Sequence, residues 1–203
     1  MEFRTKVELP AKGPKIQHTD RLMIWGSCFS EHIGNLLAEH KFNCDVNPFG
    51  VLYNPMSIAT SIQCLLKKAL YRKEDLREEQ GGWYSLMHHS TFSSHEAEDC
   101  LQKINQCITQ GHENLKQADW IIFTWGSSFV YTWKENGEIV GNCHKLPSRL
   151  FERKMVSTDE ITAIYLPLLQ ELKAIRPNLQ CLFTVSPIRH LKDGLHGNQL
   201  SKA

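Results

Sequence analysis

Short apolar runs that end at glycine or serine alternate with segments of helical periodicity along this chain. The runs over 21–25, 120–125 and 179–185 are almost continuously apolar. Such runs are typical of short strands buried on both faces of a parallel sheet. A weaker run over 44–47 is expected to form a further strand.

Apolar residues spaced three and four apart predict four helices between these runs. We expect Ser30 to cap the first helix, and Asn54, followed by a proline, to cap the second. Capping boxes over 93–96 and 157–160 predict the starts of the third and fourth. Gly111 is expected to end the third helix, and Pro167 to bend the fourth.

Strands and helices therefore alternate, which favours an α/β fold with a mostly parallel, doubly wound sheet. Residues 1–19 are expected to form an N-terminal arm, and 20–203 a single domain. The segment 71–92 has no clear period, so an irregular insertion is predicted there. Residues 131–140 are typical of a β-hairpin, with Asn136-Gly137 as a type I′ turn.

Composition disfavours several classes of protein. Among 203 residues, 23 Lys and Arg balance 22 Asp and Glu to a net charge of +1, so bulk nucleic-acid binding is not expected. No apolar run is long enough to span a membrane, and the polar start does not resemble a secretory signal. The seven cysteines form no C-x-x-C pair, which favours free thiols in a reducing cytoplasm.

Polar and reactive residues directly follow the three strongest strands. In chain order, these are Ser27, Cys28, Ser127, Ser128 and the segment 186–196. In doubly wound sheets, ligands bind outside the carboxyl ends of the strands. A helix N-terminus favours negative charge, so Ser27 or Cys28 could act there as a nucleophile. In the alternative, Ser27 and Ser30 only cap the helix and Cys28 packs beneath it.

Several motifs resemble, in order, those of the GSCFA family, especially its Bacteroidetes-type members. Gly26-Ser27-Cys28-Phe29-Ser30 resembles the motif that names the family, with Ser30 in place of the final alanine. Further similar segments are 54–59, 88–90, 124–128, 142–145 and 184–190. The family is placed by fold with the SGNH (GDSL-like) hydrolases. The resemblance therefore implies a three-layer α/β/α sandwich of flavodoxin-like type.

The resemblance also implies roles at single positions. SGNH enzymes carry Gly-Asp-Ser after the first strand, with the serine as nucleophile. Strict register gives that place to Cys28, and a shift of one residue gives it to Ser27. Gly50 matches the oxyanion-hole glycine, and Gly126 begins the segment that matches Gly-x-Asn. Ser128 replaces that asparagine, and loss of one oxyanion donor typically costs about 100–1,000-fold in turnover, which disfavours ordinary esterase activity.

A nucleophilic serine or cysteine needs a base, and the base needs an orienting group. SGNH enzymes supply both as Asp-x-x-His near the C-terminus. Asp193 and His196 have this spacing. The family resemblance also implies a further helix, a strand and a later Asp-x-x-His-Pro. On that second hypothesis the chain is truncated, and the segment 186–202 only lines the pocket.

Four more side chains are candidates for the pocket wall. His89 and His144 lie in family-like motifs, although single histidines more often have surface or core roles. His190 and its neighbour Arg189 are suited to an anionic substrate group. No ligand spacing indicates a metal, and no organic cofactor is expected.

The sequence indicates two alternative functions. The first is hydrolysis or transfer of an acyl ester, with a small molecule or a carbohydrate O-acyl group as substrate, through a Ser27 or Cys28 nucleophile. The alternative is a non-catalytic domain that keeps the crevice and binds a glycan or a peptide. No nucleic-acid or membrane partner is expected, and the sequence leaves the oligomeric state open.

Overall fold

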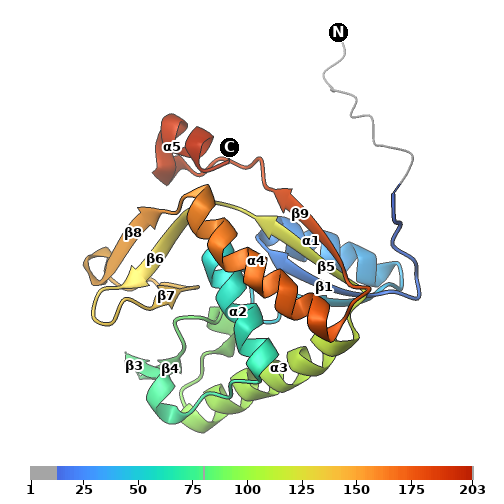
Figure 1. Cartoon of the computed structure of the whole chain (residues 1–203). Helices are drawn as coiled ribbons and strands as arrows, with labels where there is room; N and C mark the ends of the chain where they lie inside the picture. Colours follow the sequence, from blue (N-terminus) through green and yellow to red (C-terminus); the bar gives the residue numbers. More distant parts are fainter. Residues whose placement is uncertain (1–12, 80, 203) are drawn as a thin grey trace.

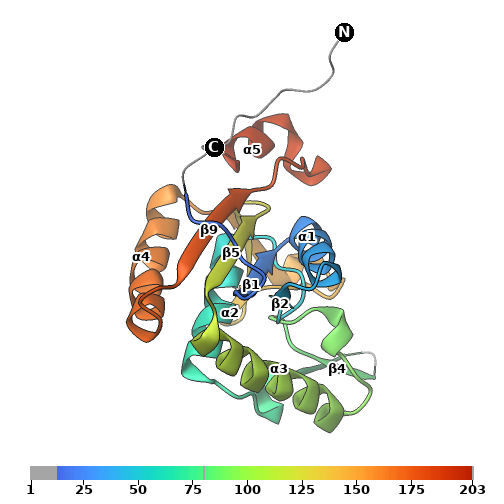
Figure 2. The same ribbon diagram turned by 90° about the vertical axis from the view of Figure 1, so that its right-hand side faces the viewer.

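Four parallel strands form the central sheet of the computed structural model, which describes residues 13–79 and 81–202 (Figure 1 and Figure 2). They are β1 (Arg21–Gly26), β2 (Asn43–Val46), β5 (Trp120–Trp125) and β9 (Gln180–Val185), in the order β2-β1-β5-β9. If only these four strands are numbered in chain order, the order in the sheet is 2-1-3-4. The first four strands of flavodoxin-like sheets have the same order. The four predicted strands are confirmed. Most of the predicted arm, 1–12, lies outside the described residues.

Helices cover both faces of this sheet, which confirms the α/β sandwich (Figure 2). α1 (Cys28–Glu39) packs on one face, against β1 and β2. The other face carries α2 (Pro55–Lys67), α3 (Ala97–Gln117) and α4 (Thr158–Ile175). The period of two along β1 explains the division, because Leu22 packs in the cluster on the α1 side and Met23 in the larger cluster on the opposite side.

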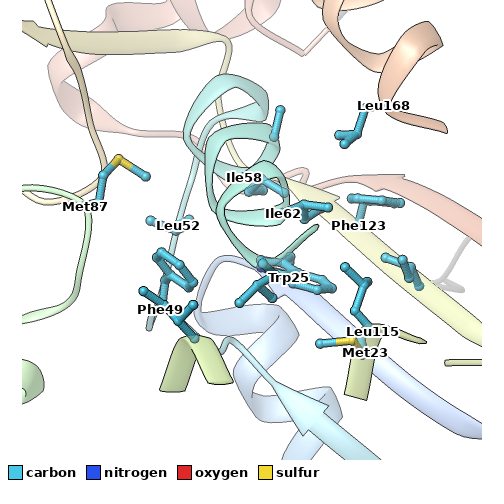
Figure 3. Close-up of a cluster of buried hydrophobic side chains, with 14 of the residues drawn as sticks. Met23, Trp25, Phe49, Leu52, Ile58, Ile62, Met87, Leu115, Phe123 and Leu168 are labelled. Carbon is cyan, nitrogen blue, oxygen red and sulfur yellow. The ribbon is translucent and has the colours of Figure 1, made fainter. Parts of the chain in front are cut away.

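The main core lies between the sheet and the three helices α2, α3 and α4 (Figure 3). Trp25 and Phe123 project from the sheet and are fully buried, as are Ile58 and Ile62 of α2. Each such side chain contributes roughly 1.5–3 kcal/mol of burial free energy. This packing holds the carboxyl ends of β1 and β5 at fixed positions.

β9 is confirmed as a strand, but its apolar side chains are partly exposed. Leu182, Phe183 and Val185 are 42%, 38% and 49% exposed. The reason is position, because β9 pairs only with β5 and forms the edge of the sheet among the described residues.

A second, three-stranded sheet lies beyond the carboxyl end of β5. It contains β6 (Phe129–Trp133), β7 (Ile139–Val140) and β8 (Phe151–Met155), all antiparallel. The predicted hairpin is confirmed as β6 and β7, but its type I′ turn is wrong. That turn needs positive φ at both central residues, and only Gly137 has it (φ +74°). β8 was not predicted, because three of its five residues are charged.

The segment 71–92 is more ordered than predicted. It contains a 3-10 turn, η1 (Lys73–Asp75), and the antiparallel strands β3 (Arg77–Glu79) and β4 (Gly82–Tyr84). A second turn, η2 (Ser90–Phe92), follows. The charged residues Glu78 and Glu79 are exposed, so these strands lack the apolar alternation on which the prediction relied.

The starts of the helices follow the predicted signals in two cases out of four. The predicted Asn54 cap and the capping box of Ser157 and Glu160 are confirmed. Ser27, not Ser30, caps α1, and the box predicted over 93–96 does not form.

α3 also runs past Gly111 to Gln117. Gly111 lies inside the helix because a Cβ there would stand only 2.9 Å from the Leu65 side chain of α2. The glycine therefore permits close helix packing and does not end the helix. Pro167 lies within α4.

Candidate functional site

The turns after β1 and β5 are joined to the loop between β2 and α2. The Asn47 side chain accepts a hydrogen bond from the Gly26 N–H at 2.9 Å. The Tyr53 carbonyl accepts from the N–H groups of Gly126 (2.7 Å) and Ser127 (3.0 Å). These bonds fix three separate chain segments at the carboxyl edge of the sheet.

A cavity of about 620 Å³, called here the strand-end cavity, lies at this edge. Its wall includes Cys28 from the first turn, Tyr53 from the loop after β2, and His190, Lys192 and Asp193 from the segment beyond β9. These three segments therefore meet at one hollow. A larger cavity of about 770 Å³ involves η1, 85–87 and 136–139 and contains none of the strand-end residues. We therefore place the candidate site in the strand-end cavity.

The two candidate nucleophiles have different environments. Ser27 is 3% exposed, and its hydroxyl accepts the N–H of Phe29 at 3.3 Å as the cap of α1. Cys28 is the first residue of α1, is exposed, and lines the strand-end cavity. The alternative that packs Cys28 beneath the helix is therefore wrong. Among the described residues, the N–H of Cys28 has no acceptor.

The predicted oxyanion residues do not present free donors to the cavity. The Gly50 N–H donates to the Asn47 carbonyl at 2.7 Å, so the prediction of Gly50 as a donor needs correction. The Gly126 N–H is likewise taken, by Tyr53. The Ser128 hydroxyl is buried without a hydrogen-bond partner in the described part of the chain, and Ser128 is absent from the cavity wall.

Asp193 and His196 do not form the predicted pair. The Asp193 carboxylate lies in the cavity wall but forms an ion pair with the Arg153 guanidinium. His196 lies on α5 (Gly194–Leu200), is exposed, and does not line the cavity. Within the described residues, no hydrogen bond joins the two side chains. The sequence could not show this, because Arg153 comes from the unpredicted strand β8.

Two other predicted wall residues lie elsewhere. The His144 Nε2 lies 2.9 Å from the Ser85 carbonyl and 3.1 Å from that of His88, which gives His144 a structural role. Burial lowers the pKa of His144, which favours the neutral ring. Arg189 is exposed and stands outside the cavity wall.

His89 and His190 do line the strand-end cavity, as predicted. The His190 ring meets Tyr53 edge-on at 5.9 Å, and its nitrogens form no hydrogen bond within the described residues. Asn198, which is 3% exposed, accepts from the His190 N–H at 2.8 Å and donates to the His190 carbonyl at 2.7 Å.

Tyr53 lies in the same cavity wall as Cys28 and His190. The pKa of Tyr53 is raised by burial first and then by the neighbouring Cys28 and Glu31 side chains. Tyr53 therefore lies close to the thiol and packs against the His190 ring.

Sequence reasoning missed an aromatic and basic part of the wall. The Arg153 guanidinium lies 3.7 Å from the centre of the Phe129 ring. The Lys192 ammonium donates to the Tyr131 hydroxyl at 2.8 Å. For Phe129, Tyr131 and Arg153, alternation along β6 and β8 was the only signal, and it indicates a shared sheet face only once the pairing of the two strands is known. Lys192 lies on the segment after β9 and had no such signal.

Fold and site together define an α/β protein with a cavity at the carboxyl edge of a parallel sheet and a thiol at a strand-to-helix turn. The chain belongs to the GSCFA family, which it matches over residues 21–203. Comparison with curated proteins and with solved structures gives no match. Within the described residues, no helix is both long and apolar enough to cross a membrane.

Proposed function

We propose that this protein hydrolyses or transfers the acyl group of an ester, with Cys28 as the nucleophile. One observation carries the proposal: Cys28 is exposed at the start of α1 and shares the strand-end cavity with His89 and His190. A helix N-terminus favours a thiolate and a developing oxyanion. Ser27 is the weaker candidate, because its buried hydroxyl already caps the helix.

The reaction proceeds in two steps. His190 accepts the thiol proton as the Cys28 sulfur attacks the ester carbonyl, and the tetrahedral intermediate collapses to a thioester. The departing alkoxide takes the proton from His190. Water, or an alcohol in the transfer reaction, then attacks the thioester with His190 again as base, and the Cys28 thiolate leaves and regains a proton. The N–H of Cys28 faces no competing acceptor among the described residues and contributes to oxyanion stabilisation.

The cavity wall supports a polar substrate with apolar faces, such as an O-acylated carbohydrate. Phe129 and Tyr131 supply aromatic rings, while Asn142 and Lys192 supply polar groups. Sugars present both kinds of surface. All seven cysteines are free, which is consistent with a reducing compartment such as the cytoplasm.

The second candidate is a non-catalytic domain that binds a glycan or peptide in the same cavity. It is favoured by the ion pair of Asp193 with Arg153, which removes the predicted orienting carboxylate. In the described part of the chain, no carboxylate hydrogen-bonds to His89 or His190.

Hydrolysis of p-nitrophenyl acetate tests the proposal. We expect Cys28→Ala to abolish turnover, whereas Ser27→Ala loses about 0.5–2 kcal/mol of stability as a cap deletion but keeps activity. Cys143→Ala is the matched control, because Cys143 is a second free thiol in the same cavity wall. Equal rates in all variants, or no hydrolysis by the wild type, would contradict the enzyme proposal.

A further inference from the structure

The geometry points to His89 as the side-chain hydrogen-bond donor to the oxyanion, held in that role by Thr91. This inference rests on the proposed acyl-transfer function. It gives the two cavity histidines different tasks, with His190 as the base and His89 as the donor.

The hydrogen bonds of His89 fix which ring nitrogen carries the proton. The Thr91 backbone N–H donates to the His89 Nδ1 at 3.3 Å, and the Thr91 hydroxyl lies 3.2 Å from the same atom. A nitrogen that accepts an N–H bond has no hydrogen of its own, so the neutral ring carries its proton on Nε2. Such a ring donates through Nε2 and has no free lone pair with which to deprotonate a thiol.

His190 has the opposite character. No group in the described part of the chain hydrogen-bonds to its ring nitrogens, so one of them keeps a free lone pair in the neutral form. Its backbone N–H and carbonyl, in contrast, both form hydrogen bonds with the Asn198 side chain. Only His190 of the pair is therefore suited to accept the Cys28 proton.

His89 also lies directly against Gly50, whose backbone N–H is not available as an oxyanion donor. A Cβ on Gly50 would lie 2.2 Å from the His89 Cβ, so only glycine allows this approach. Gly50 has φ +80°, a conformation that also favours glycine. Its own N–H is engaged with Asn47, and the His89 N–H is engaged with the Phe49 carbonyl at 2.9 Å. The imidazole side chain is then the donor that this loop presents to the cavity.

The neighbouring residue makes this loop rigid. His88 is fully buried and stacks on Phe49 with ring centres 4.2 Å apart. Its Nδ1 lies 2.9 Å from the Ser85 hydroxyl. The backbone of His89 is thus fixed on one side by a buried ring and on the other by the turn η2. A preorganised donor of this kind stabilises charge without reorganisation during the reaction.

The test compares hydrolysis with a reaction at the same sulfur that has no oxyanion. Alkylation of Cys28 by iodoacetamide needs a thiolate but forms no tetrahedral intermediate. We expect His89→Ala to lower kcat for p-nitrophenyl acetate about 100–1,000-fold, the usual effect of one lost oxyanion donor, with KM nearly unchanged. The same variant should alkylate at the wild-type rate. His89→Gln, which keeps an N–H donor, should restore part of the turnover.

His190→Ala is the contrasting variant, and it should slow both hydrolysis and alkylation. A His89→Ala protein that slows alkylation as much as hydrolysis would assign the base role to His89 and overturn the inference. Wild-type hydrolysis by that variant would also overturn it. If Cys28→Ala hydrolyses normally, the proposed function fails and the inference with it. If only the His89 variants behave normally, the inference alone fails.

A spectroscopic measurement tests the tautomer without reference to activity. Nitrogen-15 NMR of the histidine rings should show that the neutral ring of His89 carries its proton on Nε2 and none on Nδ1. The His89→Gln spectrum identifies the signal by its loss. The reverse tautomer would overturn the inference.

Discussion

Acid should destabilise this protein through His88. The ring is fully buried between Phe49 and the edge of Tyr71 and has no partner for Nε2 among the described residues. Burial, with a smaller contribution from His144, lowers the pKa of His88 to about 3. A histidine in the unfolded chain titrates near about 6.5. Between these values the unfolded chain binds more protons, so stability falls as pH is lowered.

The size of the effect follows from this difference. At about 1.4 kcal/mol per pH unit, the contribution of His88 is nearly complete above about pH 6.5 and declines by roughly 2–3 kcal/mol between pH 7 and pH 4.5. By pH 3 the loss reaches about 4 kcal/mol. Typical domains have 5–15 kcal/mol of total stability, roughly, so this one residue would bring the protein close to unfolding.

Urea unfolding at pH 7 and pH 4.5 measures the contribution of His88 to the free energy of unfolding. Glutamine cannot titrate, so the His88→Gln variant should lose stability at pH 7 but show a pH dependence smaller than wild type by roughly 2–3 kcal/mol. His32→Gln is the matched control, because His32 is exposed on α1, and it should keep the wild-type dependence. The same pH dependence in wild type and His88→Gln would refute the reasoning.

Two further substitutions test the loops around the cavity. Asn198→Ala removes the side chain that holds the His190 backbone, so steady-state kinetics should show a lower kcat while a thermal melt shows a loss of about 1–3 kcal/mol. A variant with unchanged kcat would argue against His190 as the base. Gly50→Ala should destabilise by more than 1 kcal/mol, on the order of the cost of a strained backbone plus a clash with His89. Gly137→Ala is its control, since Gly137 has a similar positive φ but no neighbouring atom within 4 Å, and equal losses in a urea titration would contradict the contact with His89.

The sequence was most informative where local pattern and tertiary structure agree. The apolar run 120–125 forms β5 because a central parallel strand is covered on both sides by its own neighbours. Asn54 and Ser157 cap helices because a cap depends on atoms only two or three residues away. The convergence of the strand ends follows from parallel topology alone.

The failures share a different cause. Gly111 is a typical helix-ending residue, but here it lies inside α3. The Leu65 side chain of α2 occupies the space that a Cβ at this position would take. β8 has the composition of a surface loop and is ordered by pairing with β6. Asp193 has the spacing of a catalytic partner for His196, yet β8 supplies Arg153 as its partner instead. Each outcome depends on a residue distant in sequence, which local periodicity cannot identify.

Mass spectrometry of the acyl-enzyme tests the central claim most directly. The protein is incubated with p-nitrophenyl acetate, quenched in acid during turnover, and digested. We predict one acetyl group on the peptide that contains Cys28, released by hydroxylamine as a thioester and absent from Cys28→Ala. An acetyl group on Ser27 or Cys143 in its place, or continued turnover without any adduct in Cys28→Ala, would contradict the account.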